Sequence, residues 1–198
     1  GADTETVEGC VWLFATEFGV WEPKTFADII DICSLRVHVS KWKKSKATKN
    51  GAKRGFSPKE FFFYNLQFDV QAVLKLMSSR AIMGLLKEGK CTINADTGDF
   101  LPKVKGRMCK LKYLEGKYFR IQPVDWFIGQ YKIGPIQWWD ISPFFFKSSL
   151  NNAAKQYLGR EKLEECFDGS ILDASNFDDH EYRDYYAEDI EKYAVIDC

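Results

Sequence analysis

Four carboxylates lie in three short segments of this 198-residue chain, in contexts that could bring them to one site. Asp3 and Glu5 are two residues apart, so on a strand both side chains would leave the same face. Asp69 opens a stretch with apolar residues at helical spacing, and Asp197 follows Tyr193 by four residues, about one helical turn. Carboxylate oxygens are ligands that Mg²⁺ and Mn²⁺ prefer, so these four residues are candidate metal ligands.

The segment around Asp69 also has a simpler interpretation. A strand-like aromatic run over 61–64 ends at Asn65, and Asp69 follows four residues later. An Asp that enters a helix beside an apolar core needs a partner, a metal or a capping role, because an unpaired buried carboxylate is costly. A helix cap with a chance Asp therefore stays open as an alternative to a metal ligand.

The three segments together resemble a known family. Asp-x-Glu at 3–5, Asn-x-x-Phe-Asp at 65–69 and Tyr-x-x-x-Asp at 193–197 stand in the order of the three motifs of the DEDDy 3′–5′ exonucleases. These are the proofreading domains of family B DNA polymerases. The resemblance is strongest to the protein-primed polymerases of phages, plasmids and viruses, whose first motif also reads Asp-x-Glu-Thr before an apolar stretch containing Val-Trp. It covers nearly the whole chain.

The resemblance implies hydrolysis of phosphodiester bonds with two divalent cations, Mg²⁺ or Mn²⁺, which such chemistry uses to activate water and stabilise the leaving oxygen. It implies that Asp3 bridges both cations, that Asp69 acts through the second and that Asp197 binds the first. Glu5 and Tyr193 would position the attacking water.

The resemblance also implies contacts to the substrate. Asn65 and Phe68 would line the strand that carries the 3′ end, and Thr4, within the first motif, is a further predicted contact. The implied partners are the 3′ end of single-stranded DNA and the polymerase domain of the same or a larger chain.

The third motif has two possible registers. Tyr185 and Asp189 have the same spacing as Tyr193 and Asp197, but eight residues rotate a helix by about 80°, so both pairs cannot face one site. The apolar residues 194–196 favour the later pair, and acidic neighbours suit Asp189 to a solvated turn. Tyr193 and Asp197 are therefore preferred, and the earlier pair stays open.

The chain is expected to combine strands and helices in one α/β domain. The resemblance implies a ribonuclease H-like (DnaQ-like exonuclease) mixed sheet flanked by helices, with a β-hairpin insertion. The expected strands cover 10–20, 61–64, 110–113, 118–122 and 136–141, with a hairpin joining 91–94 to 103–105. The expected helices cover 25–33 with Thr25 as cap, a stretch from Phe68, 148–159 ended by Gly159, and a last helix from about His180.

A net charge of zero hides an uneven distribution. Residues 41–60 hold eight Lys or Arg and one acid, 103–120 hold seven and one, and 161–198 hold thirteen acids and three basic residues. The segment 41–60 is interpreted either as a solvated loop or as a contact to nucleic-acid phosphates, with Trp42 as a stacking face. His38 and Asp140 are expected to be structural residues.

Composition limits the remaining possibilities. With 45% apolar residues, 198 residues are enough for one globular domain with a sizeable core. The six Cys form no Cys-x-x-Cys pattern and are expected to be free thiols in a reducing compartment. No run has the length of a membrane span, so we expect no membrane partner. The expected location is intracellular and cytoplasmic, and the resemblance implies that the protein is DNA-associated.

We therefore expect residues 1–198 to form one exonuclease domain of a longer polymerase chain, since only Gly1 and Ala2 precede the first motif. Its expected function is 3′–5′ removal of nucleotides from DNA, as in proofreading. Two alternatives stay open: a nucleic-acid-binding module of the same fold that has lost catalysis, and a stand-alone exonuclease that trims RNA.

Overall fold

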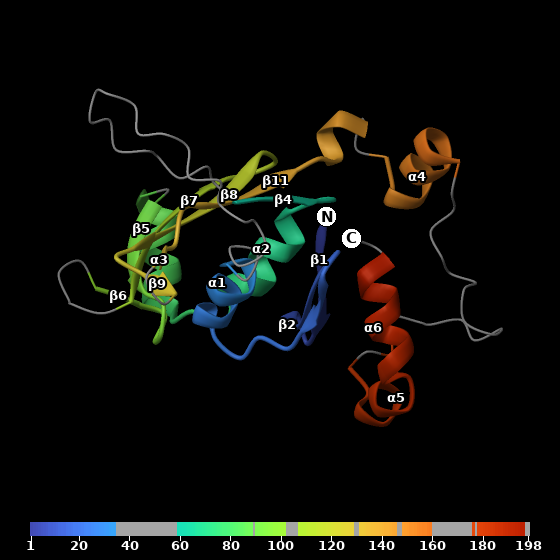
Figure 1. The fold of residues 1–198 in the computed structure, drawn as a ribbon, viewed down its shortest axis with the longest axis horizontal. Helices are drawn as coiled ribbons and strands as arrows, with labels where there is room; N and C mark the ends of the chain where they lie inside the picture. The colour runs from blue at the N-terminus through green and yellow to red at the C-terminus, as the bar shows by residue number, and fades with distance from the viewer. Residues whose placement is uncertain are drawn as a thin grey trace.

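A computed structural model describes residues 1–34, 59–88, 90–101, 107–128, 131–145, 148–159, 176 and 178–196. In these ranges the chain is a mixed α/β structure with two main sheets and one two-stranded ribbon (Figure 1). The elements in chain order are β1 (Ala2–Val7), β2 (Cys10–Thr16), β3 (Gly19–Trp21), α1 (Phe26–Ser34), β4 (Lys59–Phe63), α2 (Gln67–Leu74), α3 (Ser79–Glu88), β5 (Lys90–Asn94), β6 (Asp99–Phe100), β7 (Met108–Leu114), β8 (Tyr118–Val124), β9 (Phe127–Ile128), β10 (Tyr131–Lys132), β11 (Ile136–Asp140), the 3₁₀ helix η2 (Ser142–Phe145), α4 (Leu150–Leu158), α5 (His180–Tyr185) and α6 (Ala187–Ile196).

The larger sheet has six strands in the order β4-β11-β8-β7-β5-β6. It is mixed, because β4 and β11 run parallel while the other neighbours are antiparallel. One face packs on α1, α2 and α3 and carries the buried rings of Phe63, Trp138 and Phe119. The Trp138 ring lies 4.7 Å from that of Phe63 and 5.5 Å from that of Phe119. The prediction of a mixed sheet flanked by helices is confirmed.

The smaller sheet holds the first motif in its strand β1. β1, β2 and β3 are antiparallel neighbours, and the register of β1 on β2 shifts between Glu5 and Thr6, as at a β-bulge. β1 and β2 lie between α2 on one side and α6 on the other (Figure 1), and β1 also contacts β4 of the larger sheet. Leu13 of β2 packs against Ile190 of α6, and this contact brings the C-terminal helix to the N-terminal strands.

Helix α1 is fixed at both ends by specific hydrogen bonds. The Thr25 hydroxyl accepts from the Asp28 amide at 3.3 Å, and the Asp28 carboxylate accepts from the Thr25 amide at 2.7 Å. This reciprocal pair is a capping box and confirms Thr25 as the cap. At the other end, Lys59 Nζ of β4 donates to the carbonyls of Cys33 at 3.1 Å and Ser34 at 2.5 Å.

Local signals also predict several other elements correctly. Strands β7, β8 and β11 match the predicted strands within a few residues. Helix α4 has the Ser149 hydroxyl as its N-cap, accepting from the Asn152 amide, and Gly159 at its C-cap with a φ of 64°. None of the helices in the described ranges has the length and apolar character needed to cross a membrane.

Two predicted strand regions differ from the structure. The strand predicted over 10–20 is the hairpin β2–β3, because the chain turns before Gly19, whose φ of 148° favours glycine. The hairpin after β5 closes early on β6: the Gly98 amide, at a φ of 68°, donates to the Asn94 carbonyl at 2.7 Å. The predicted partner 103–105 lies outside the described ranges.

The last predicted helix is two helices in the structure. α5 ends at Tyr185, and Tyr186 leaves helical geometry with a φ of −104°. The Tyr186 carbonyl then accepts from the Asp189 and Ile190 amides and begins α6. The break has a direct consequence for the two registers of the third motif, which are compared below.

Candidate active site

The first and second motifs meet at a hydrogen bond between β1 and α2. The Thr4 hydroxyl donates to the Asp69 carboxylate at 2.8 Å, across 65 positions of sequence. Asp69 is 4% exposed, and Asp3 lies close enough to act on its ionisation. The structure therefore brings Asp3 and Asp69 together.

The turn between β4 and α2 determines which side chains face this pair. Asn65 adopts a φ of 64°, which Asn tolerates better than most residues, and its carbonyl accepts from the Phe68 amide at 3.2 Å. Consecutive residues on a helix point about 100° apart. Asp69 accordingly faces inward, while the neighbouring Phe68 ring is 68% exposed.

A cleft of about 590 Å³ opens beside the carboxylate pair. It is lined by parts of β1, the turn before α2, the start of α2 and the start of α4: Asp3, Thr4, Thr6, Tyr64, Asn65, Phe68, Asp69, Ser148, Ser149 and Leu150. Four predicted site residues besides Asp69 — Asp3, Thr4, Asn65 and Phe68 — thus share one cavity.

The electrostatics of the pair favour a bound cation or proton. Burial raises the pKa of the Asp69 carboxyl well above its ordinary value of 3.8, and the nearby Asp3 carboxylate raises it further. The Thr4 hydroxyl and backbone amides act in the opposite direction, because they donate to the charged form. An added positive charge at this point would relieve the repulsion between the two carboxylates.

Glu5 is placed differently from Asp3. Its side chain is buried at 9% exposure, opposite Leu13 of β2, and it is not among the residues lining the cleft. In the described ranges, no group of three or more His, Cys, Asp or Glu side chains is arranged to hold a metal ion. Asp197, the fourth predicted ligand, lies outside those ranges.

The two candidate registers of the third motif have different surroundings. Tyr193 is half-buried on α6, which packs against β1 and β2 through the buried Ile190 and Ala194. Tyr185 is 81% exposed at the end of α5, and Asp189 pairs with Lys192 at 3.3 Å on α6. Because the break at Tyr186 puts Tyr185 and Asp189 on separate helices, they lack the one-turn relation that the motif requires.

Several cleft residues were not among the predicted site residues. Thr6 follows Glu5 in the Asp-x-Glu-Thr pattern, which was a signal in the sequence for its place in the cleft. Ser149 and Leu150 were interpreted only as the start of a capped helix, and Ser149 does cap α4. The Tyr64 hydroxyl donates to the Ser148 carbonyl and so ties this helix to the end of β4.

A second cleft of about 510 Å³ shares Tyr64, Asn65 and Ser148 with the first. It also contains Asp140, at the end of β11. The Asp140 carboxylate accepts from the Ser142 amide at 3.0 Å and from the Ser142 hydroxyl at 2.7 Å. These bonds give Asp140 the structural role at a strand end that the sequence predicted.

Other predictions concern parts of the chain that the structure does not describe. The basic segment 41–60 falls there except for its last two residues, as does His38. Comparison with protein-family models, with curated proteins and with solved structures finds no match for this chain.

Proposed function

We propose that this chain is a metal-dependent 3′–5′ exonuclease that removes nucleotides from the 3′ end of DNA. The observation that carries the proposal is the meeting of Asp3 and Asp69 in one cleft, joined by the hydrogen bond from Thr4. Two carboxylates 66 positions apart in sequence, from the first and second motifs, are the minimum that the proposed chemistry needs. In the proposal the domain proofreads for a family B polymerase and works with that polymerase domain.

The arrangement of elements supports the proposed ribonuclease H-like architecture. The smaller sheet contains β1 from the start of the chain, and α2 from the middle and α6 from the end pack against it (Figure 1). Asp3 lies on β1, Asp69 lies on α2 and Tyr193 lies on α6. The buried contact of Leu13 with Ile190 gives the C-terminal helix a fixed place next to β1.

The donor chemistry of the cleft fits Mg²⁺ or Mn²⁺. Asp3 and Asp69 offer carboxylate oxygens, and no thiol or imidazole is among the residues that line the cleft. Two such cations, when bound, would activate water and stabilise the leaving oxygen. Asp3 and Asp69 would hold them, with Asp197 as a further proposed ligand, whereas Glu5 is buried and does not line the cleft.

Other side chains have proposed roles toward substrate and water. Thr4 fixes the orientation of the Asp69 carboxylate. The exposed Phe68 ring offers a face on which the terminal base can stack, which is how proteins hold single strands without sequence preference. Asn65 and Ser149 add polar groups along the same cleft. Tyr193 is proposed to orient the attacking water.

The proposal is tested by following a single strand labelled at its 3′ end, with Mn²⁺ in excess. We expect labelled mononucleotide to be released at once, and no release in EDTA. A second strand labelled at its 5′ end should shorten one nucleotide at a time, which excludes an endonuclease. An RNA strand of the same sequence tests the choice of DNA. If neither strand is cut although the protein binds it, the chain is a binding module without catalysis.

A further inference from the structure

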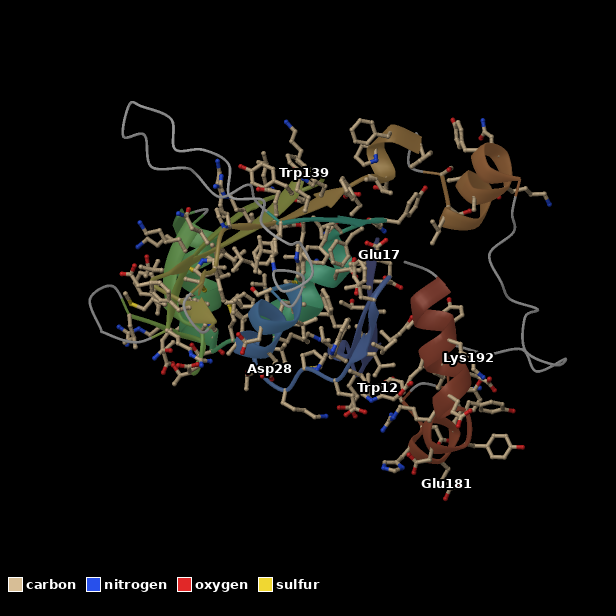
Figure 2. The ribbon with its side chains drawn as sticks, in the orientation of Figure 1. Trp12, Glu17, Asp28, Trp139, Glu181 and Lys192 are labelled. Atoms are coloured by element: carbon tan, nitrogen blue, oxygen red, sulfur yellow. The ribbon has the colours of Figure 1, made fainter. Side chains whose placement is uncertain are left out.

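The six-stranded sheet has a second face, turned away from α1, α2 and α3. Side chains paired across neighbouring strands point to the same face, so the strand register defines rows on it. One row, here called the aromatic row, consists of Phe62 on β4, Trp139 on β11, Tyr118 on β8 and Leu114 on β7. Figure 2 labels Trp139 on the side of the sheet opposite α1 and α2.

A basic row runs beside the aromatic row, two residues along each strand. It contains Arg120 on β8 and Lys112 on β7, and Lys110 stands two residues further along β7. The Lys112 ammonium lies 5.5 Å from the centre of the Tyr118 ring, so charge and ring are in contact. The two rows together are called the outer sheet face.

Rings on the outer sheet face are ordered by their neighbours and still accessible. The Tyr118 and Trp139 rings meet edge to face at 5.8 Å, and neither side chain is fully buried. Phe62 and Leu114 are exposed. A row of partly exposed rings supported by a rigid sheet is a surface on which planar groups can stack.

Among the described residues of this face, Lys110, Lys112 and Arg120 are cations and Glu60 is a carboxylate. No carboxylate in the described part of the chain forms an ion pair with Lys110, Lys112 or Arg120. The acid in the basic row is Glu60, and its carboxylate accepts a hydrogen bond from Trp139 Nε1 at 3.3 Å. With three cations and one carboxylate, these residues carry a net positive charge, which suits an anionic partner.

We propose that the outer sheet face binds single-stranded nucleic acid, with bases on Trp139 and Tyr118 and phosphates on Lys110, Lys112 and Arg120. Stacking rings interleaved with basic residues match a polymer that alternates planar bases with phosphates. A protein partner fits less well, because lysines are depleted in protein–protein interfaces. The choice of nucleic acid as the partner rests on the proposed function. Binding of a strand to this face does not itself require catalysis.

The position of this face suits a strand whose end lies in the cleft. β4 carries Phe62 on the outer sheet face and ends at Phe63, and Tyr64 and Asn65 of the next turn line the cleft. The outer sheet face would therefore hold nucleotides upstream of the 3′ end. Longer strands would gain affinity from it and very short strands would not.

Binding is measured by fluorescence anisotropy with a labelled deoxythymidine 20-mer in EDTA, where cleavage cannot occur. The double variant Lys110→Gln/Lys112→Gln should bind more weakly and flatten the dependence of log K on log salt by about 1.4, since each phosphate contact to a single strand contributes about 0.7. The matched control Lys24→Gln/Lys192→Gln removes the same charge from exposed positions elsewhere and should keep the slope. Figure 2 shows Lys192 on α6, away from the six-stranded sheet.

Replacement of the rings tests stacking. Trp139→Ala and Tyr118→Leu should each weaken binding on the order of tenfold, the typical loss when a stacking ring is removed. Circular dichroism melting shows whether each variant is folded. The lysine variants change exposed positions only, so they decide the question even if a ring variant does not fold.

The outcomes separate this proposal from the proposed function. With Mn²⁺, the lysine variant should cut a trinucleotide at the wild-type rate and a 20-mer less efficiently at low concentration. Equal losses on both substrates, or an unchanged salt slope, would overturn the outer sheet face as a binding surface and leave the cleft assignment standing. The proposal would also be overturned if the wild type self-associates and the same variants abolish this association. The outer sheet face would then join two copies of the chain. Absence of cleavage with intact strand binding would overturn the proposed function alone.

Discussion

The Thr4 hydroxyl on β1 donates a hydrogen bond to the Asp69 carboxylate on α2 at 2.8 Å. This bond joins the smaller sheet to α2, the helix that follows strand β4 of the larger sheet. It holds Asp69 beside Asp3 at the cleft. The predictions about catalysis depend on this relationship.

Removing either carboxylate should abolish cleavage and leave the fold intact. Asp3→Ala and Asp69→Ala each eliminate a proposed metal ligand and also relieve repulsion between like charges. The measurement is release of labelled nucleotide with Mn²⁺, with thermal melting as the check on folding. Glu181→Ala, which removes an exposed carboxylate from α5 (Figure 2), should cleave like the wild type. Retained cleavage in Asp69→Ala would contradict the site.

The contribution of Asp69 to the stability of the metal-free protein should fall as pH rises above about 3.8. The pKa of Asp69 is raised by burial and by Asp3, so the folded state holds this proton more tightly than the unfolded chain. Its stabilising contribution is complete below the ordinary value of 3.8 and is lost as pH rises through the raised value.

Urea denaturation in EDTA at a series of pH values measures this effect. Asp69→Asn keeps the shape without a titrating proton, so its stability should decline less than that of the wild type toward neutral pH. Added Mn²⁺ should stabilise the wild type and have a smaller effect on the variant. Parallel pH curves for the two proteins would show that Asp69 has an ordinary pKa.

The hydroxyl of Tyr193 should matter for turnover and that of Tyr185 should not. Tyr193→Phe keeps the ring, so packing of α6 should hardly change. If the hydroxyl orients the attacking water, single-turnover cleavage slows on the order of 100-fold while strand binding stays nearly constant. Tyr185→Phe is the matched control, since that side chain is 81% exposed. A slow Tyr185→Phe variant would transfer the third motif to Tyr185 and Asp189.

Lys59 should stabilise the domain through the end of α1. Its ammonium donates to the carbonyls of Cys33 and Ser34, where the negative end of the helix dipole lies. Lys59→Met keeps most of the stem and removes the charge, so we expect a loss of about 2 kcal/mol, typical of a bond with a charged donor at a partly exposed site. Lys24→Met, at a solvated position, should change stability by less than about 0.5 kcal/mol in the same denaturant titration.

Thiol reactivity should separate the cysteines that the structure describes. Cys10 is exposed, whereas Cys33, Cys91 and Cys109 are buried free thiols. Burial raises the pKa of Cys33 to about 12, although Trp138 and Lys59 act against it. At pH 8 Cys33 therefore stays protonated and protected.

Titration with a coloured disulfide reagent checks this in a background that carries Cys166→Ser and Cys198→Ser. One thiol should react in the native protein, and all four described cysteines should react in urea. A Cys10→Ser variant should remove the fast reaction. A second fast thiol in the native state would mean that the structure opens readily, either at the core around Cys33 or at strands β5 and β7, which carry Cys91 and Cys109.

Local interactions explain which parts of the fold could be predicted from the sequence. The capping box of Thr25 and Asp28 and the cap of α4 at Ser149 join residues a few positions apart, so residue types suffice to recognise them. Gly19 was harder, because its positive φ value turns the chain at a point that a count of apolar residues does not mark.

The candidate site divides in the same way. The sequence by itself determined the three motifs and the residue types within them, including the two carboxylates that share the cleft. Only the tertiary structure decided that Thr4 holds Asp69, that Glu5 is buried and does not line the cleft, and that Ser149 does line it, because these facts depend on contacts between distant segments. It also separated Tyr193 from Tyr185: the spacing of the two pairs is identical, but the helix breaks at Tyr186 and only α6 buries Ile190 and Ala194 beside the smaller sheet.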